Sequence, residues 1–334
     1  MKRFRTGVVI GKFFPPHKGH HYLINQASAQ CAHLSVLVCW KSEQDISIDI
    51  RLGCLHEIHP DAEIIAVNDD LPDYDSAAWA YRTIQVLGYS PDAVFTSEDY
   101  GDSYAALMGS IHVMVDRERA IVPCSGTMIR QSPLDYLECL SPFMRAHYVK
   151  RVCVVGAEST GTTTLAKFLA DHYHTAWVPE YGREYCIQKW KDGYTDEWTS
   201  DEFTHIAEEQ SNREDTAARI ANRVVFGDTD AFATSIWHRR YLETRNLEVE
   251  SLAAKRHYDL YLLTGDEIPF EQDGYRDGES IRHWMHQEFI RELDSSGRSW
   301  ALISGNHQMR MAKSIRLVDG ILKAHTHSSN DNTK

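Results

Sequence analysis

The chain has 334 residues, 43% of them hydrophobic and 25% charged, and 48 acidic residues against 35 Lys and Arg give a net charge of -13. These values exclude disordered and fibrous proteins, fit two domains, and disfavour general nucleic-acid binding through phosphate neutralisation. No apolar run is long enough for a transmembrane helix, and the run near the N-terminus is too short for a signal peptide. We therefore expect a cytoplasmic globular protein without membrane or nucleic-acid partners.

The seven cysteines are an odd number, and none of them forms a CxxC pair. Cys31, Cys39, Cys54 and Cys153 lie in or beside apolar runs, as buried thiols do. This pattern predicts neither a disulfide nor a structural zinc site, in keeping with a reducing compartment.

The first half of the chain alternates short apolar runs with helix-like stretches. Strands are predicted at residues 6–10, 34–39, 63–67, 93–96 and 111–115, with helices that include 20–31 and 76–88. Short, nearly continuous apolar strands joined by helical crossovers predict a parallel sheet covered on both faces.

The same alternation begins again at residue 151. Strands are predicted at 151–156, 223–228, 258–265 and 299–305, with helices over 162–173 and 200–223 and a helical connector at 140–151. We therefore expect two α/β domains with mainly parallel sheets, at residues 1–148 and 149–325, and a frayed tail at 326–334.

The loop after the first predicted strand contains a candidate phosphate site. Gly11 and Gly19 allow close backbone approach, and His17 and His20 stand where the loop becomes a helix. Two imidazoles there can donate hydrogen bonds to charge that develops on a phosphate. The alternatives are a proline-rich turn with exposed histidines, or a zinc site for which no third ligand is visible.

A second candidate segment follows the last strand of the same half. Ser125 and Thr127, on either side of Gly126, can cap a helix whose first N–H groups bind phosphate. Arg130 adds a permanent charge with fork geometry. Together with the histidine loop, this segment forms a specific combination within one α/β domain.

HKGH at 17–20 and CSGTMIR at 124–130 resemble the HxGH and ISGTxxR signatures of the nucleotidyltransferase superfamily. The resemblance implies a Rossmann-like domain that binds ATP across the edge of the sheet. It implies that His17 and His20 contact the phosphates and that Lys12 and Arg130 support the departing pyrophosphate. In such a reaction the acceptor's phosphate attacks the α-phosphorus directly, and catalysis is positioning plus charge stabilisation.

A second glycine-rich loop, GAESTGTTTL at 156–165, follows a strand and begins a helix. Gly156 and Gly161 have the spacing of the phosphate loop GxxxxGK[ST], and Thr163 occupies the hydroxyl position that holds Mg²⁺. Thr162 stands where that loop has its lysine, so a glycine turn at the start of a buried βαβ unit is an equal alternative. A backbone nest and the helix dipole can still bind phosphates.

Two pairs of polar residues follow other strands of this half. Asp228 and Asp230 end an apolar strand, where carboxylates hold Mg²⁺, contact substrate hydroxyls or cap a helix. Glu180 and Arg183 follow an earlier strand and are candidates for binding substrate.

An ordered series of motifs resembles the NadR-like family, the bifunctional nicotinamide-nucleotide adenylyltransferases and ribosylnicotinamide kinases, from Thr6 to about Lys323. The motifs include GKFFPPHKGH, FTSEDYG, CSGTMIRQSPLDYLECL, VVGAESTGTTTLA, VPEYGREY, FGDTDAFAT and QDGYRDG. The resemblance implies phosphorylation of nicotinamide riboside by ATP, then adenylyl transfer to the mononucleotide to give NAD and pyrophosphate. It also implies an adenylate-kinase-like P-loop fold for the second domain, with Mg²⁺ as its metal.

By motif position, Asp228 or Asp230 would hold the riboside hydroxyls and activate the acceptor, and Asp228 would bind Mg²⁺ with Thr163. Arg276 and Arg282 would be lid arginines, although their segment could also be a solvated loop. FTSEDYG would line the adenine pocket. Nothing in the spacing identifies the acceptor base: Trp40, Trp79 and Tyr81 could stack on a pyridinium ring, or they could belong to the core.

Thr162 leaves two functions open for the second domain. In a working kinase, another cation takes the place of the lysine, with Arg276 and Arg282 as the candidates. Otherwise the second domain is a silent nucleotide sensor attached to a monofunctional adenylyltransferase. A third hypothesis is an adenylyltransferase for a different phosphorylated acceptor.

Some NadR-like proteins carry an N-terminal helix-turn-helix that represses transcription. We expect none here, because the first predicted strand begins within the first ten residues. Assembly into a homo-oligomer remains open.

Overall fold

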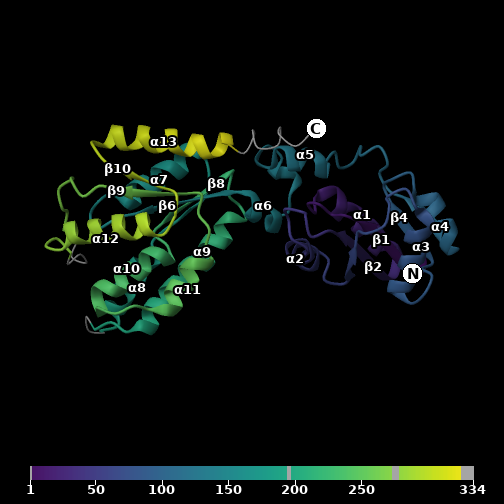
Figure 1. Ribbon diagram of the computed structural model, residues 1–334, viewed down its shortest axis with the longest axis horizontal. Coiled ribbons are helices and arrows are strands. Elements are labelled where there is room, and N and C mark those ends of the chain that lie inside the picture. The colour runs from purple at the N-terminus through teal and green to yellow at the C-terminus, as the bar shows by residue number, and fades with distance from the viewer. Residues whose placement is uncertain (1, 194–196, 273–277, 325–334) are drawn as a thin grey trace. The chain divides into compact units, whose positions relative to one another are not determined.

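The computed structural model describes residues 2–193, 197–272 and 278–324 (Figure 1). The chain divides into two compact units, Met1–Met144 and the part from Arg145 onward. Each unit is built on a five-stranded parallel sheet, which confirms the predicted fold class. Among the described residues, no helix is both long and apolar enough to cross a membrane.

The sheet of the first unit has the order β3-β2-β1-β4-β5. Its strands are β1 (Phe4–Gly11), β2 (Cys31–Trp40), β3 (Glu63–Asn68), β4 (Ala93–Thr96) and β5 (Ile111–Met114). Its helices are α1 (Lys18–Gln30), α2 (Ile48–Ile58), α3 (Ser76–Leu87), α4 (Gly101–Met108), α5 (Gly126–Gln131) and the 3-10 turns η1 (Pro133–Asp135) and η2 (Leu137–Cys139). A short helix, α6 (Pro142–Tyr148), spans the boundary to the second unit.

Alternate side chains of this sheet fill two separate cores. Val9 and Val36 pack with residues of α1 and α2, whereas Val8 and Leu37 pack with residues of α3 and α4. Successive side chains of a strand point to opposite faces, so a strand covered on both sides must be apolar throughout. The nearly continuous apolar runs in the sequence have this cause.

The sheet of the second unit has the order β10-β9-β6-β8-β7. Its strands are β6 (Lys150–Val155), β7 (Trp177–Val178), β8 (Val224–Asp228), β9 (Leu260–Thr264) and β10 (Trp300–Ile303). Its helices are α7 (Thr162–Tyr173), α8 (Tyr181–Lys191), α9 (Ser200–Ala218), α10 (Ala231–Leu242), α11 (Leu247–Lys255), α12 (Arg282–Ser295) and α13 (His307–Ala324).

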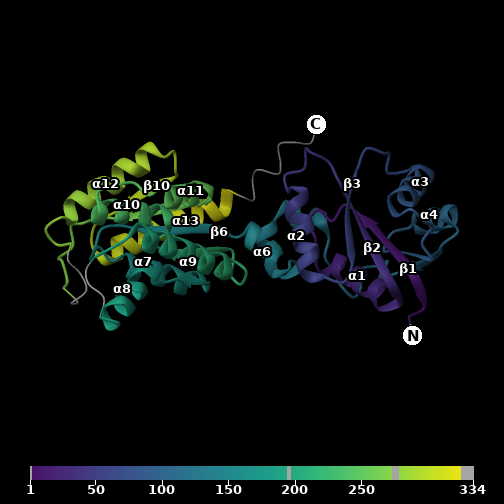
Figure 2. The ribbon, with the colours of Figure 1, turned by 90° about the horizontal axis from the view of Figure 1, so that it is seen from below.

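Helices also cover both faces of this second sheet. In Figures 1 and 2, α7 and α13 lie together against the sheet, and α9, α10 and α11 form a second group. The core on the side of the second group includes Phe203, Phe232, Phe289 and Tyr261. With both faces covered, the loops at the carboxyl ends of the strands are left to bind ligands.

The predicted end of the long polar helix is wrong. The long polar helix α9 ends at Ala218 and does not continue to residue 223. Arg223, directly before β8, has a φ of 66°. This left-handed conformation does not occur inside an α-helix, so the chain leaves the helix before the strand begins.

Candidate active sites

A cavity of about 490 Å³ opens at the carboxyl edge of the first sheet. This volume lies within the range of small-molecule sites. The predicted residues among its lining are Gly11, Lys12, His17, Gly19, His20 and Trp79. The FTSEDYG segment, predicted to line an adenine pocket, contributes Thr96, Ser97, Glu98 and Tyr100 to the same wall.

His17 caps the N-terminus of α1. Its Nδ1 accepts a hydrogen bond from the backbone N–H of Gly19 at 3.1 Å. Burial, helped by the charge of Arg119, lowers the pKa of His17 to about 4. The ring is therefore neutral at pH 7 with its proton on Nε2, which can donate to a ligand.

His20 lies against His17, with ring centroids 3.7 Å apart and planes inclined by 23°. Burial, and then the neighbouring His17, holds the pKa of His20 well below its usual range. Its Nδ1 is buried and has no hydrogen-bond partner among the described residues. The two rings therefore offer hydrogen-bonding groups to a phosphate, while positive charge has to come from other side chains.

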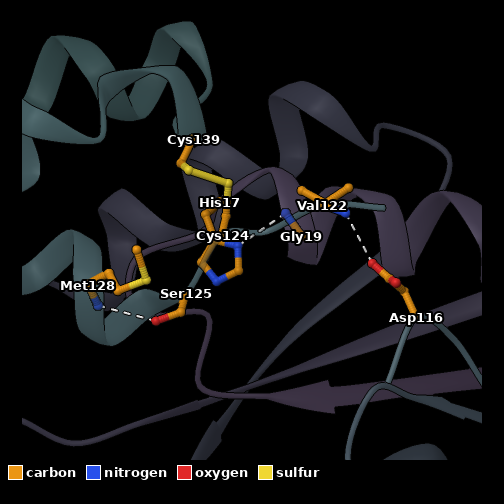
Figure 3. Close-up of a disulfide and its surroundings, with 8 residues drawn as sticks. All are labelled: His17, Gly19, Asp116, Val122, Cys124, Ser125, Met128 and Cys139. Carbon is orange, nitrogen blue, oxygen red and sulfur yellow. Dashed lines mark hydrogen bonds between the residues drawn. A yellow bond between two sulfur atoms is a disulfide. The ribbon is translucent and has the colours of Figure 1, made fainter. Parts of the chain in front are cut away.

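The second predicted segment packs against the histidine loop. Ser125 caps α5 by accepting a hydrogen bond from Met128 N at 3.2 Å, as Figure 3 shows beside His17. The guanidinium of Arg130 donates to the carbonyl of Phe14. A side chain at Gly126 would meet that carbonyl at 2.8 Å, so the close approach of the two segments requires glycine.

Cys124, in the same segment, forms a disulfide with Cys139 (Figure 3). The expectation of no disulfide is wrong. The sequence shows only a separation of 15 residues, whereas the fold brings the two Cα atoms to 5.8 Å. The other five cysteines form no disulfide, and the four predicted to be buried thiols are buried.

Charged residues that the sequence did not single out also line this cavity. Asp69 and Asp73 form ion pairs with Lys12 Nζ at 3.4 and 3.1 Å, and Arg119 lies on the opposite side of the sheet order, after β5. Partial burial lowers the pKa of Lys12, but the hydrogen bond to Asp73 and the charge of Asp69 outweigh it, so the pKa is raised. The position of Asp69 directly after β3 was the available signal, because parallel strands end at one shared edge.

The three aromatic candidates for stacking differ in position. Trp79 is 9% exposed, belongs to the core beneath α3 and also lines the cavity. Trp40 lies at the end of β2 but is not among the lining residues, and Tyr81 is 65% exposed. Trp79 is therefore the candidate that fits a ring-binding role.

The second glycine-rich loop connects β6 to α7. Gly161, with a φ of 85°, precedes the helix, and Thr163 Oγ1 donates to Asp228 Oδ2 at 2.5 Å. Burial raises the pKa of Asp228, while hydrogen bonds from Thr163 and Thr162 act in the opposite direction. A hydroxyl and a carboxylate in contact are oxygen ligands of the kind that Mg²⁺ prefers.

Asp230 lies elsewhere, inside the core. It is fully buried, caps α10 by accepting from Ala233 N at 2.9 Å, and accepts from Tyr261 Oη at 2.7 Å. Burial raises the pKa of Asp230. Its oxygens are occupied within the fold, so its position argues against the catalytic role suggested by the sequence.

The segment predicted to be a lid contacts the glycine-rich loop on both sides of the undescribed residues 273–277. Glu271 N donates to Ser159 Oγ at 2.8 Å, and Gly278 N donates to Glu158 Oε2 at 2.7 Å. Arg282 Nη2 donates to the Ser159 carbonyl at 3.1 Å. Arg282 therefore lies beside the loop as predicted, whereas Arg276 lies outside the described residues.

Arg310, which the sequence did not single out, holds the loop from the other side. Its guanidinium donates to the carbonyls of Thr160, Gly265 and Gly305 and to Glu267, at 2.7 to 3.0 Å. The N–H groups of its guanidinium are therefore engaged by acceptors within the protein. Its position on α13, far along the chain, gave no local signal.

A second cavity, of about 680 Å³, lies beside α8. The predicted residues Glu180 and Arg183 line it, together with Tyr181 and Tyr185. The charge of Arg183 acts on Asp228, so this cavity lies close to the loop site. Its aromatic and charged lining suits a polar molecule that carries a ring.

Comparison with known proteins finds similar sequences for both units of the chain. Residues 151–310 match the model of the "AAA domain" family. The trifunctional NAD biosynthesis/regulator proteins NadR of Escherichia coli (strain K12) and Salmonella typhimurium (strain LT2) are each 28% identical over 310 residues, covering 86% of this chain and 75% of theirs. The chain is a homologue of NadR.

Two crystal structures of NadR share the fold of this chain. One, in complex with NR, has a TM-score of 0.77 at 22% identity and covers 96% of both chains. The other, in complex with NAD and AMP-PNP, has a TM-score of 0.74 at 22% identity and covers 96% of this chain and 97% of that one. The order of elements in both units is therefore that of NadR.

The disulfide predicts a measurable effect of reduction. Closing a loop of this length stabilises a protein by about 3 kcal/mol, so reduction should lower the melting temperature of the first unit by roughly 10 °C. Scanning calorimetry with and without a phosphine reductant measures the shift. A Cys124→Ser/Cys139→Ser variant should not respond to the reductant, and titration of the unfolded wild type should find five thiols. Seven thiols and equal melting temperatures would contradict the disulfide.

The buried histidines predict a loss of stability in mild acid. In the folded state the pKa of His17 is about 4 and that of His21 about 3, both lowered mainly by burial. Below pH 6.5 the unfolded chain binds more protons, so the free energy of unfolding should fall by about 2 kcal/mol per histidine at pH 5. Urea unfolding at pH 7 and pH 5 measures this difference.

Two histidine variants test whether the buried histidines cause this pH dependence of stability. His21→Gln removes one of the two groups and should reduce the pH difference, whereas His33→Gln, at an exposed position, should leave it unchanged. Equal unfolding free energies of the wild type at the two pH values would contradict the effect of the buried histidines.

Proposed function

We propose that this chain acts in NAD salvage and catalyses two reactions. The second unit phosphorylates nicotinamide riboside with ATP, and the first transfers the adenylyl group of ATP to the mononucleotide, giving NAD and pyrophosphate. The observation that supports the proposal is that each unit of this NadR homologue has a loop leading into a helix N-terminus whose polar side chains could bind phosphate. NadR structures that contain NR, NAD and AMP-PNP support these ligands.

In the first unit the protein positions the reactants and stabilises charge. The mononucleotide's phosphate oxygen attacks the α-phosphorus of ATP, the bond to the β-phosphate oxygen breaks, and pyrophosphate leaves. His17, with its proton on Nε2, donates a hydrogen bond to the phosphates, and the ring of His20 stacks on the ring of His17. Lys12 and Arg119 supply the positive charge that the neutral imidazoles lack.

In the second unit the glycine-rich loop binds the phosphates of ATP through its backbone N–H groups and the N-terminus of α7. Thr163 and Asp228 would hold Mg²⁺, which would supply positive charge to neutralise the phosphates. Glu180 and Arg183, in the adjoining cavity, bind the riboside. The oxygen of the riboside hydroxyl then attacks the γ-phosphorus, the bond between that phosphorus and the β-phosphate oxygen breaks, ADP leaves, and the hydroxyl proton is released.

Thr162 removes the cation that normally accompanies the transferred phosphoryl group. Arg282 is the described cation that contacts the loop from the lid side, whereas Arg310 is bound to carbonyls within the protein. We propose that Arg282 supplies the missing charge. The alternative for this unit is a silent nucleotide sensor, favoured by Thr162 alone.

The two activities should be separable. His20→Ala should reduce formation of NAD from the mononucleotide by about a hundredfold or more, as the loss of a transition-state donor does, and should spare riboside phosphorylation. Asp228→Asn should do the reverse. Incubation with ATP, Mg²⁺ and either acceptor, followed by chromatography, measures both reactions. Asp230→Asn keeps a capping oxygen and should retain both activities; if His20→Ala also retains adenylyl transfer, the first site is misassigned.

The charge supplied by Arg282 is testable against a neighbour on the same helix. Arg282→Ala should lower riboside phosphorylation by about a hundredfold while ATP still binds, because the cation acts on the transition state. Arg291→Ala, 61% exposed in its side chain, is the matched control and should have full activity. Chromatography of the mononucleotide formed and calorimetric titration with ATP give the two readouts.

A different result would favour the sensor. If wild type binds ATP without phosphorylating the riboside, and Thr162→Lys restores turnover, the second unit is a nucleotide-binding module whose chemistry was lost with the lysine.

A further inference from the structure

Asp69 is a buried carboxylate that the reactions above do not use. It follows β3, is 3% exposed and lines the cavity of the first unit. Neither of its carboxylate oxygens has a hydrogen-bond partner in the described part of the chain. Its Oδ2 lies 3.4 Å from Lys12 Nζ and 3.8 Å from Lys41 Nζ.

A carboxylate removed from water normally receives several hydrogen bonds, because an unpaired buried charge is costly. Lys12 and Lys41 balance the charge of Asp69 from 3.4 and 3.8 Å, but the hydrogen bonds of Lys12 go to Asp73, at 3.1 Å, so the hydrogen-bonding capacity of the Asp69 oxygens stays unused within the described residues. Asp69 can therefore accept N–H or O–H groups from a molecule in the cavity. A ligand that donates such a group would satisfy the carboxylate.

The position of Asp69 indicates which part of the ligand this is. Asp69 follows β3 at one edge of the sheet, whereas Arg119 follows β5 at the other edge, with the loop of His17 and His20 after the central strand β1. The phosphate-binding groups therefore occupy the centre and the β5 side of the cavity. The acceptor's ring is left for the β3 side, beside Asp69.

An aromatic side chain, Trp79, lies on the β3 side as well. Trp79 lines the cavity, and its Nε1 donates to the carbonyl of Pro72 at 3.2 Å, which fixes the plane of the indole ring. A fixed indole face can stack on a pyridinium ring. The β3 side thus combines a surface for the ring with a hydrogen-bond acceptor for its substituent.

We infer that Asp69 is a specificity-determining residue that recognises the substituent on the acceptor's pyridine ring. The inference rests on the adenylyl transfer proposed above. A carboxamide donates an N–H to Asp69, whereas a carboxylate at the same place has no proton to donate and meets a like charge. Asp69 therefore favours the amidated mononucleotide over its deamidated acid.

The test compares kcat/KM of the full chain for the two mononucleotides, with the dinucleotide product resolved by chromatography. Wild type should prefer the amidated substrate. Asp69→Asn has nearly the same shape, removes the charge and adds an N–H₂ donor, so it should shift the ratio toward the deamidated substrate by on the order of tenfold or more. Asp69→Ser, a second uncharged variant, should shift the ratio in the same direction, and calorimetric Kd ratios should follow.

Asp73→Asn is the matched control, because Asp73 also pairs with Lys12 but is exposed. It should change both efficiencies together and leave their ratio constant. If folded Asp69→Asn and Asp69→Ser do the same, Asp69 only positions Lys12 and the inference is overturned. A wild type that makes neither dinucleotide would instead contradict the proposed function.

Discussion

The burial of both faces of each parallel sheet is the constraint on which the rest of this structure depends. Val8 and Val9 point into different cores, so neither face of β1 can carry polar chemistry. The candidate functional side chains therefore lie at the carboxyl ends of strands or in the segments that directly follow them. His17 and Asp69 in one unit, and Thr163 and Asp228 in the other, all follow this rule.

The same burial decides the chemistry of the first site. Burial lowers the pKa of His17 and His20, so in the proposed reaction the HxGH motif would act through directed hydrogen bonds. A directed N–H is most effective when its ring cannot turn, and the cap from Gly19 N fixes His17. Positive charge is left to Lys12 and Arg119, whose longer side chains reach the cavity from its rim.

Local patterns in the sequence predicted most of the strands and the two loops, because each depends on residues that are close in sequence, and the family resemblance implied the Thr163–Asp228 pair. Local patterns could not predict contacts between segments that are distant in the sequence. The Cys124–Cys139 disulfide depends on a 3-10 turn, and the buried position of Asp230 depends on the hydroxyl of Tyr261. Asp69 stands directly after a predicted strand, but the lack of hydrogen bonds to its carboxylate oxygens among the described residues is visible only once the neighbouring side chains are placed.

The lost lysine shows that the shape and the charge of a phosphate loop are separable. Arg310 binds the carbonyl of Thr160, and the backbone N–H of Gly278 binds Glu158, so contacts that need no lysine at position 162 hold the conformation of the loop. Nucleotide binding depends on that conformation, since backbone N–H groups and the helix dipole act on the ground state. Transfer depends in addition on a cation that follows the phosphoryl group in the transition state. With threonine in place of the lysine, the groups that bind the phosphates are still present. In the proposed function, the cation needed in the transition state is then Arg282, which contacts the loop from the predicted lid segment.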